Sequence, residues 1–204
     1  MSSPGRRPEI LFLPGAAGDH ALVTRLRAGD ERAYEELYNL HAPKLFRLLR
    51  RLVASGPIAE DVVQETFAAA FRAVGRFRGE ASLATWITGI GIRHALNALR
   101  GQARRLRSEC LAEAETVCDA TESWLVGRSV ARTVLGILDK IEPEKRSALL
   151  LHAEGYTATE IAGIMGVPRG TVLSRMARGR AELIEFAVRA GIVPNKASAE
   201  EGGV

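Results

Sequence analysis

Aromatic residues are scarce in this chain of 204 residues: they make up 5% of it, while hydrophobic residues make up 47%. Aliphatic side chains must therefore build most of the core. Long apolar runs are also absent. The apolar segment ILFL near the start is far shorter than the ~20 residues of a membrane span or the ~7–15 of a secretory signal core. We therefore expect a soluble, cytoplasmic protein with no membrane insertion.

Cysteine and histidine are rare as well, with two and four residues. Cys110 and Cys118 are too few for a disulfide framework, and no histidine pair flanks them at zinc-binding spacing. The histidines are scattered and join no carboxylates in a recognisable metal or acid–base arrangement. The sequence thus predicts no metal, no cofactor and no catalytic site. An enzyme acting on nucleic acid is the least favoured class.

Lysine occurs only four times, so 24 of the 28 basic residues are arginine. The net charge is only +4, but the charges are segregated. Segment 93–107 has five arginines and no acid, and segment 108–127 has five acids and no base. Arginine forks onto phosphates and guanine edges, and a basic segment concentrates near a polyanion. Nucleic acid is the first partner to consider, although a GC-rich coding bias would also produce an excess of arginine.

Helical periodicity predominates from 19 to 188, and no stretch of more than a few residues alternates with period two. The fold class is therefore all-α. We expect the two ends, 1–18 and 189–204, to be loose. Asp19 and Asp30 are predicted helix N-caps, with Gly29 as a stop between them. Pro43 should kink or divide the second helix. That helix carries an apolar series that we expect to be core: Leu37, Leu40, Leu45, Leu48, Leu49 and Leu52.

Two further predicted helices before residue 108 carry polar residues along one face. In the helix that begins near Pro57, Asp61, Gln64 and Glu65 share one face, and periodicity alone makes this face a solvated surface. The next helix, with Ser82 as its expected cap, buries two apolar stripes. A third line runs between those stripes: Trp86, Gly89, Arg93, Asn97 and Arg100. A lone tryptophan is more often core than contact, but its alignment with Arg93 and Asn97 favours a contact.

The second block, 128–188, has the pattern of a helix-turn-helix. Thr157 and Glu160 form a capping box, Gly166 supplies a turn, and Pro168 suits the first turn of the next helix. In that helix we expect Val172, Met176, Gly179 and Leu183 on the packed side. The residues predicted to enter a major groove are Thr171, Ser174, Arg175 and Arg178, whereas Arg180 would reach a phosphate. An unrelated helical hairpin with a basic surface is the alternative.

Two sequence segments match one known family. EDVVQETFAAAFRAVGRFRGEASLATWITGI, followed by LDKIEPEKRSALLLHAEGYTATEIAGIMGVPRGTVLSRMARGRAEL, resembles bacterial extracytoplasmic-function (ECF) sigma factors, the small two-domain specificity subunits of RNA polymerase. The resemblance covers about 20–107 and 128–186. It implies two small helical domains, a region 2-like one at 19–107 and a region 4-like four-helix one with the helix-turn-helix at 128–188. The acidic linker 108–127 would join them.

The resemblance also implies roles. The face of Asp61, Gln64 and Glu65 would dock on core RNA polymerase, and the helix of the third line would read and open the −10 promoter element. Its contact residues would be Trp86, Arg93, Asn97 and Arg100. The −35 element would be read by Thr171, Ser174, Arg175, Arg178 and Arg180. The linker would pass through the polymerase channel, and an anti-sigma protein would be a further partner.

Two departures from the family bear on DNA reading: many members carry Asn at the position of Arg93 and a basic residue at that of Leu173. These departures leave the −10 base preference open and remove one expected DNA contact. The alternative function is a helix-turn-helix transcription regulator that acts without polymerase. It would leave the line of Trp86, Arg93 and Asn97 and the acidic linker without a role.

Overall fold

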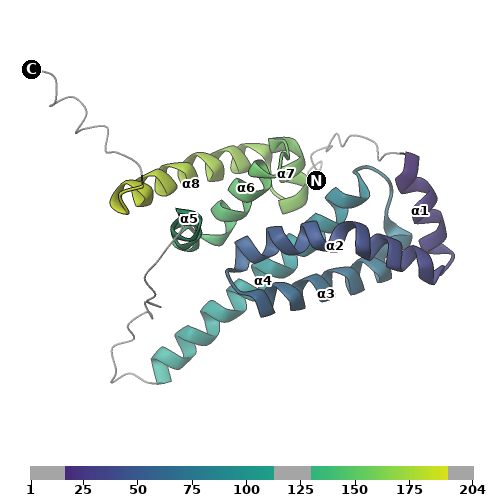
Figure 1. Cartoon of the computed structure of the whole chain (residues 1–204), viewed down its shortest axis with the longest axis horizontal. Coiled ribbons are helices and arrows are strands. Elements are labelled where there is room, and N and C mark those ends of the chain that lie inside the picture. The colour runs from purple at the N-terminus through teal and green to yellow at the C-terminus, as the bar shows by residue number, and fades with distance from the viewer. Residues whose placement is uncertain (1–16, 113–129, 193–204) are drawn as a thin grey trace, which may run out of the picture.

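The computed structural model describes residues 17–112 and 130–192, and these residues form helices joined by short turns (Figure 1). The first domain comprises α1 (Ala17–Arg27), α2 (Glu31–Val53), α3 (Gly56–Ala73), the 3-10 turn η1 (Val74–Arg76) and α4 (Leu83–Ala112). The second comprises α5 (Val130–Asp139), α6 (Pro143–Ala153), α7 (Ala158–Met165) and α8 (Arg169–Arg189). The expected all-α class and two-domain organisation are confirmed.

Helices α2, α3 and α4 build the core of the first domain. α2 contributes the buried side chains of Leu37, Leu45, Leu48, Leu49 and Leu52. The prediction that Leu40 belongs to this core is wrong, because Leu40 is 65% exposed. At 100° per residue it lies roughly 120° around the helix from the centre of the buried stripe. Pro43 lies inside α2 without dividing it.

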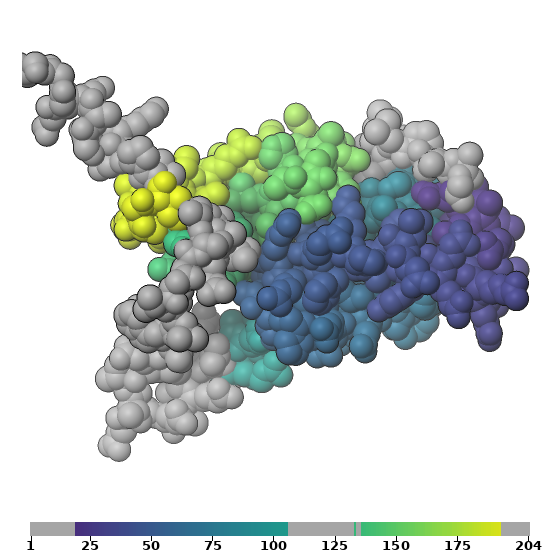
Figure 2. Space-filling view, in the orientation of Figure 1, coloured from purple at the N-terminus to yellow at the C-terminus, as the bar shows by residue number. Residues whose placement is uncertain are grey.

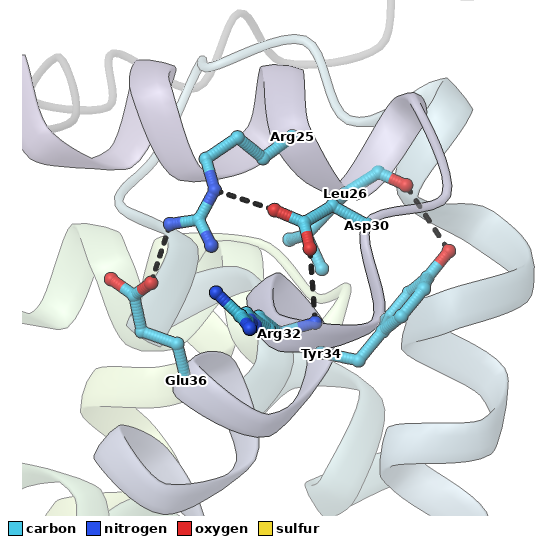
Figure 3. Close-up of polar contacts among 6 residues, drawn as sticks. All are labelled: Arg25, Leu26, Asp30, Arg32, Tyr34 and Glu36. Atoms are coloured by element: carbon cyan, nitrogen blue, oxygen red, sulfur yellow. Dashed lines mark hydrogen bonds and ion pairs between the residues drawn. The ribbon is translucent and has the colours of Figure 1, made fainter.

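The corner between α1 and α2 is held by polar contacts around Asp30 (Figure 3). Its carboxylate accepts hydrogen bonds from the backbone N–H of Arg32, at 3.0 Å, and from Nε of Arg25, at 2.8 Å. Asp30 is therefore the N-cap that the sequence predicts. The bond from Arg25 lowers the pKa of the Asp30 carboxyl group. Tyr34 closes the corner by donating its hydroxyl proton to the carbonyl oxygen of Leu26, at 3.1 Å.

Asp19 has a different role from the predicted one. Asp19 lies within α1 and not at its start, because α1 begins at Ala17. The helix thus begins inside the segment 1–18 that was expected to be loose. The carboxylate of Asp19 instead accepts a hydrogen bond from the backbone N–H of Leu83, at 2.8 Å, and so caps α4. Ser82 caps the same end, because its hydroxyl accepts from the N–H of Thr85, at 3.1 Å. The first turn of α4 is thus fixed by a residue 64 positions earlier in the chain.

The second domain has the helix-turn-helix geometry. Thr157 and Glu160 form the predicted capping box at the start of α7, and Gly166 ends α7 in the left-handed conformation with φ of 65°. A left-handed residue here turns the chain sharply into α8. Arg146, only 4% exposed, donates to Asp139 at 2.6 Å and ties α6 to the end of α5.

The two domains pack against each other (Figure 2). α7 and α6 lie on α4 and α2, and one continuous core includes residues of both domains. Helix α4 continues to Ala112, into the segment expected to be the linker. The rest of that segment and most of the expected loose ends lie outside the described residues. No helix in the described part of the chain has the length and apolar character needed to cross a membrane.

Candidate nucleic-acid interface

The start of α4 and the turn before it enclose a pocket of about 240 Å³. Trp86 is half-buried, and its ring centroid lies 5.2 Å from that of Phe77 at an interplanar angle of 55°. Three guanidinium-bearing side chains line the same pocket: Arg76, Arg78 and Arg93. The sequence predicts that Trp86 and Arg93 lie on one line of the helix, and the structure places both in the lining of this pocket. Arg76, Phe77 and Arg78 are pocket residues that the sequence analysis missed. They belong to the run GRFRG shortly before the helix, and its two arginines are the only signal that could have indicated them.

This pocket combines surfaces that suit a nucleotide. Aromatic rings offer a stacking face to any base, worth roughly 1–3 kcal/mol per base. Guanidinium groups supply donors for phosphate oxygens and base edges. On its remaining side the pocket is lined by Gly163 and Ile164, which belong to α7 of the other domain. The pocket therefore lies at the junction of the two domains.

Farther along α4 the predicted line continues on the surface. Arg93, Asn97 and Arg100 are exposed, whereas Gly89 is buried beneath α7. Arg100 donates to Oδ1 of Asn97 at 3.3 Å and forms an ion pair with Glu144 of α6 at 2.8 Å. Burial raises the pKa of Glu144, but the hydrogen bond from Arg100, a backbone hydrogen bond and the charges of Arg100 and Arg175 together outweigh burial, so the net shift is downward. The line is thus part solvent-exposed and part domain contact.

The outer face of α8 forms a second polar surface. Val172, Met176 and Gly179 are buried as predicted, and Leu183 is half-buried. On the opposite side Ser174, Arg178 and Arg180 are exposed, and Thr171 and Arg175 are half-buried. Four of the predicted residues line a shallow depression of about 430 Å³: Thr171, Ser174, Arg175 and Arg178. Leu173, 43% exposed, places an apolar side chain beside these donors.

One lysine on this depression is already engaged. The ammonium group of Lys145 lies 2.6 Å from Glu182 and 3.3 Å from Glu142. These contacts raise its pKa, the bond to Glu182 contributing most. Arginines of α8, rather than this lysine, are therefore the cations available to a phosphate on this face.

The acidic face of α3 is a third surface. Asp61, Gln64 and Glu65 are all exposed, and Glu65 lies 3.1 Å from the ring of His94 on α4. Beside this face runs a groove of about 470 Å³ between α2 and α3. Its lining includes Tyr38, Asn39, Ala42, Pro43, Phe46, Glu60, Val63 and Gln64. Tyr38 and the neighbouring Leu40 are among the few large apolar residues left exposed.

Groups of three or more His, Cys, Asp or Glu side chains that could hold a metal ion are not found within 17–112 and 130–192.

Comparison with known proteins assigns both domains. Residues 37–105 match the family model of sigma-70 region 2, and residues 131–183 match sigma-70 region 4. The ECF RNA polymerase sigma-E factor of Haemophilus influenzae is 36% identical over 178 residues, covering 82% of this chain and 93% of that protein.

Two solved structures have a similar fold. CnrH in complex with the cytosolic domain of CnrY superposes with a TM-score of 0.60 at 24% identity, covering 82% of this chain and 96% of that chain. The sigma factor RpoE of Bartonella quintana, in complex with the anti-sigma factor NepR, gives a TM-score of 0.57 at 24% identity, covering 75% of this chain and 95% of that chain. With the two region matches and the relative at 36% identity, the chain belongs to the ECF family of sigma factors.

Proposed function

We propose that this sigma factor binds core RNA polymerase through the acidic face of α3, reads the −35 element with α8, and uses α4 to recognise and help melt the −10 element. The single observation that carries the proposal is the presence of two separate arginine-bearing surfaces, one per domain, of which only the one on α4 includes an aromatic pocket. Duplex reading needs donors in a groove, whereas an aromatic pocket suits an unstacked base. The protein acts in the cytoplasm and leaves the chemistry of RNA synthesis to the polymerase.

The limits that we propose are a region 2 domain at 19–107, a linker at 108–127 and a region 4 domain at 128–188. In the first domain Trp86, which packs on the buried Phe77, offers the stacking surface, and Arg93, Asn97 and Arg100 follow the strand along α4. A few stacked bases at roughly 1–3 kcal/mol each are comparable with the cost of unstacking them, so such contacts decide whether a bubble persists.

In the second domain the exposed Ser174, Arg178 and Arg180 make α8 the recognition helix. Arg178 lies in the shallow depression and suits a base edge, whereas Arg180 lies on the flank and suits a phosphate. A helix-turn-helix regulator acting without polymerase would need only this domain. The match to region 2 does not favour that alternative.

The docking face combines charge with an apolar groove. Asp61, Gln64 and Glu65 supply the charged and polar rim, and Tyr38, which lines the groove, supplies exposed apolar area beside it. Interfaces of this kind bury apolar anchors within a polar rim, and opposite charges set orientation. A basic, apolar-centred surface of the polymerase would fit this face.

Transcription in vitro with core polymerase, and mapping of the start sites, tests this function. Wild-type protein should give defined start sites only when core polymerase is present. Asp61→Arg should weaken holoenzyme formation by placing a cation against a basic surface, without unfolding α3, because Asp61 is exposed. Glu60→Gln, one position along the same helix, is a milder comparison. Unchanged affinity of Asp61→Arg for core polymerase would contradict the assignment of this face.

An anti-sigma protein completes the proposal. The sigma factor RpoE of Bartonella quintana is bound to an anti-sigma factor in its solved structure, and that complex supports a similar partner for this chain. Co-purification of the tagged chain from its host tests the partner. Full activity in cells that lack any co-purifying inhibitor would remove the idea.

A further inference from the structure

Helix α1 touches the segment of chain that forms one wall of the base pocket. This segment, the pocket loop, comprises residues 77–82 and connects η1 to α4. Four of its residues line the pocket: Phe77, Arg78, Glu80 and Ala81. α1 lies beside the loop, at one end of the first domain (Figure 1). The shape of the pocket therefore depends on how α1 holds the loop.

Arg27, the last residue of α1, holds the start of the pocket loop. Its Nη2 donates to the carbonyl oxygen of Phe77 at 2.5 Å, and its Nε donates more weakly to that of Val74 at 3.5 Å. The N–H of Phe77 donates to the same Val74 oxygen at 3.1 Å. One guanidinium group thus spans η1 and fixes the backbone that carries the Phe77 ring. Because this ring is buried against Trp86, a shift of that backbone would remove the support of the stacking surface.

Two other residues of α1 reach the rest of the pocket loop. The carboxylate of Asp19 accepts the N–H of Leu83, directly after the loop, at 2.8 Å. A Cβ atom added to Gly79, which has φ of 72°, would lie 3.5 Å from Cε1 of His20. At 100° per residue, Asp19, His20 and Arg27 lie within roughly 100° of one another around α1. One face of α1 therefore braces the loop at its start, middle and end.

The three residues of this face act on the loop and not on the contents of the pocket. Asp19, His20 and Arg27 are not among the described residues that line the pocket. Any effect of theirs on a bound base must pass through the loop. A recognition site is only as selective as its supporting contacts are rigid, and a misplacement of about 1 Å is enough to lose selectivity. Arg27 is the strongest of the three supports for the loop backbone, because a charged donor makes a stronger hydrogen bond than a neutral one.

We propose that Arg27 is a positioning residue for −10 recognition. By holding the carbonyl groups of Val74 and Phe77 it fixes the pocket loop, and so sets how sharply the pocket distinguishes one unstacked base from another. The proposal rests on the function assigned to α4 and its pocket. Arginine suits this role because its planar fork spans two acceptors, whereas lysine offers a single point charge. α1, to which no DNA or polymerase contact is assigned, thereby contributes to promoter choice.

Transcription by the holoenzyme from promoters that differ at single −10 bases tests this role. Arg27→Met keeps a long apolar stem but removes every donor. Its preference for the best over the worst base should fall about 3- to 10-fold at one −10 position. Its −35 preference and its affinity for core polymerase should equal those of wild type. Arg27→Lys keeps a cationic donor for one carbonyl and should show an intermediate −10 preference.

Arg32→Met is the matched control, because it removes an exposed arginine from the first turn of α2. It should leave both base profiles unchanged. A wild-type −10 profile in Arg27→Met would overturn the proposal. An equal loss of preference at −10 and −35 would overturn it too, because a general loss of structure affects both elements alike.

The fluorescence of Trp86 reports on the pocket in the free chain, once Trp124→Phe removes the other tryptophan. If Arg27 holds Phe77 against Trp86, Arg27→Met should shift the emission to longer wavelength and increase quenching by iodide, relative to Arg32→Met. Identical emission and quenching in the two variants would contradict the contact. Arg27→Lys carries the same measurements if Arg27→Met does not fold.

The function of the pocket is tested separately with Trp86→Ala. If this variant keeps the wild-type −10 profile and melts the promoter normally, the function assigned to α4 fails, and the role of Arg27 fails with it. If Trp86→Ala loses −10 recognition while Arg27→Met keeps the wild-type profile, the function of α4 stands and the positioning role alone is wrong.

Discussion

Removal of the Asp19 carboxylate should loosen the start of α4. Asp19 accepts a hydrogen bond at 2.8 Å from the backbone N–H of Leu83, in the first turn of that helix. Loss of an N-cap acceptor costs ~1 kcal/mol, within a range of about 0.5–2. A carboxylate near a helix N-terminus adds about 0.3–1 kcal/mol through its charge. Asp19→Ala should therefore lower the free energy of unfolding by about 1–2 kcal/mol. Asp19→Asn keeps an acceptor and should lose about half as much.

Urea unfolding followed by circular dichroism measures this cost, with Glu35→Ala, the loss of an exposed acid on α2, as the control. The control should stay within about 0.5 kcal/mol of wild type. Trp86 lies in the first turns of α4 and reports local fraying by its fluorescence, once Trp124→Phe removes the other tryptophan. Equal stability of Asp19→Ala and Glu35→Ala would refute the reasoning that Asp19 caps α4.

Three further predictions follow from exposed or buried polar groups. Arg93→Asn should shift −10 base preference toward a base that an amide reads, since arginine offers no acceptor; identical profiles across a library of −10 variants would limit Arg93 to backbone contact. Arg178→Ala should relax preference at one −35 position by about 1–3 kcal/mol if it reads a base, or weaken all sequences equally if it binds phosphate; binding assays indifferent to it would exclude both. Burial, with a smaller effect of Lys44, lowers the pKa of His41 in the folded protein. The free energy of unfolding is therefore greatest above the pKa of the unfolded state, about 6.5, and falls as the pH drops below that value. Between pH 8 and pH 5 the free energy of unfolding should fall less in His41→Gln than in wild type. The same dependence on pH in both proteins would contradict this.

Patterns within single helices were predictable because the geometry of one helix determines them. The capping box of Thr157 and Glu160 and the left-handed turn at Gly166 appear where the sequence places them. The buried side of α8, with Val172 and Met176, also follows from the 3.6-residue period alone. The exposed side of the same helix then carries the predicted polar residues, so the candidate −35 surface follows from local sequence.

Contacts across long separations could not be read in the same way. Asp19 is predicted from its position to cap the first helix, but it lies inside α1, and its carboxylate caps α4. Leu40 follows a leucine pattern but falls beyond the edge of the stripe that α3 and α4 cover. Arg76 and Phe77 join Trp86 in one pocket only because the turn after α3 folds back over the start of α4.

The sequence by itself therefore determined the helices, the caps and turns formed by neighbouring residues, the two-domain organisation and the family, because each depends on the spacing of residue types along a short segment. Only the tertiary structure decided which faces remain free. Trp86, Gly89 and Arg93 form one line by helical geometry, but Gly89 is buried because the backbone of α7 packs on it. Burial is a property of what two elements do together, and the side chains on one helix do not specify which other helix will cover them.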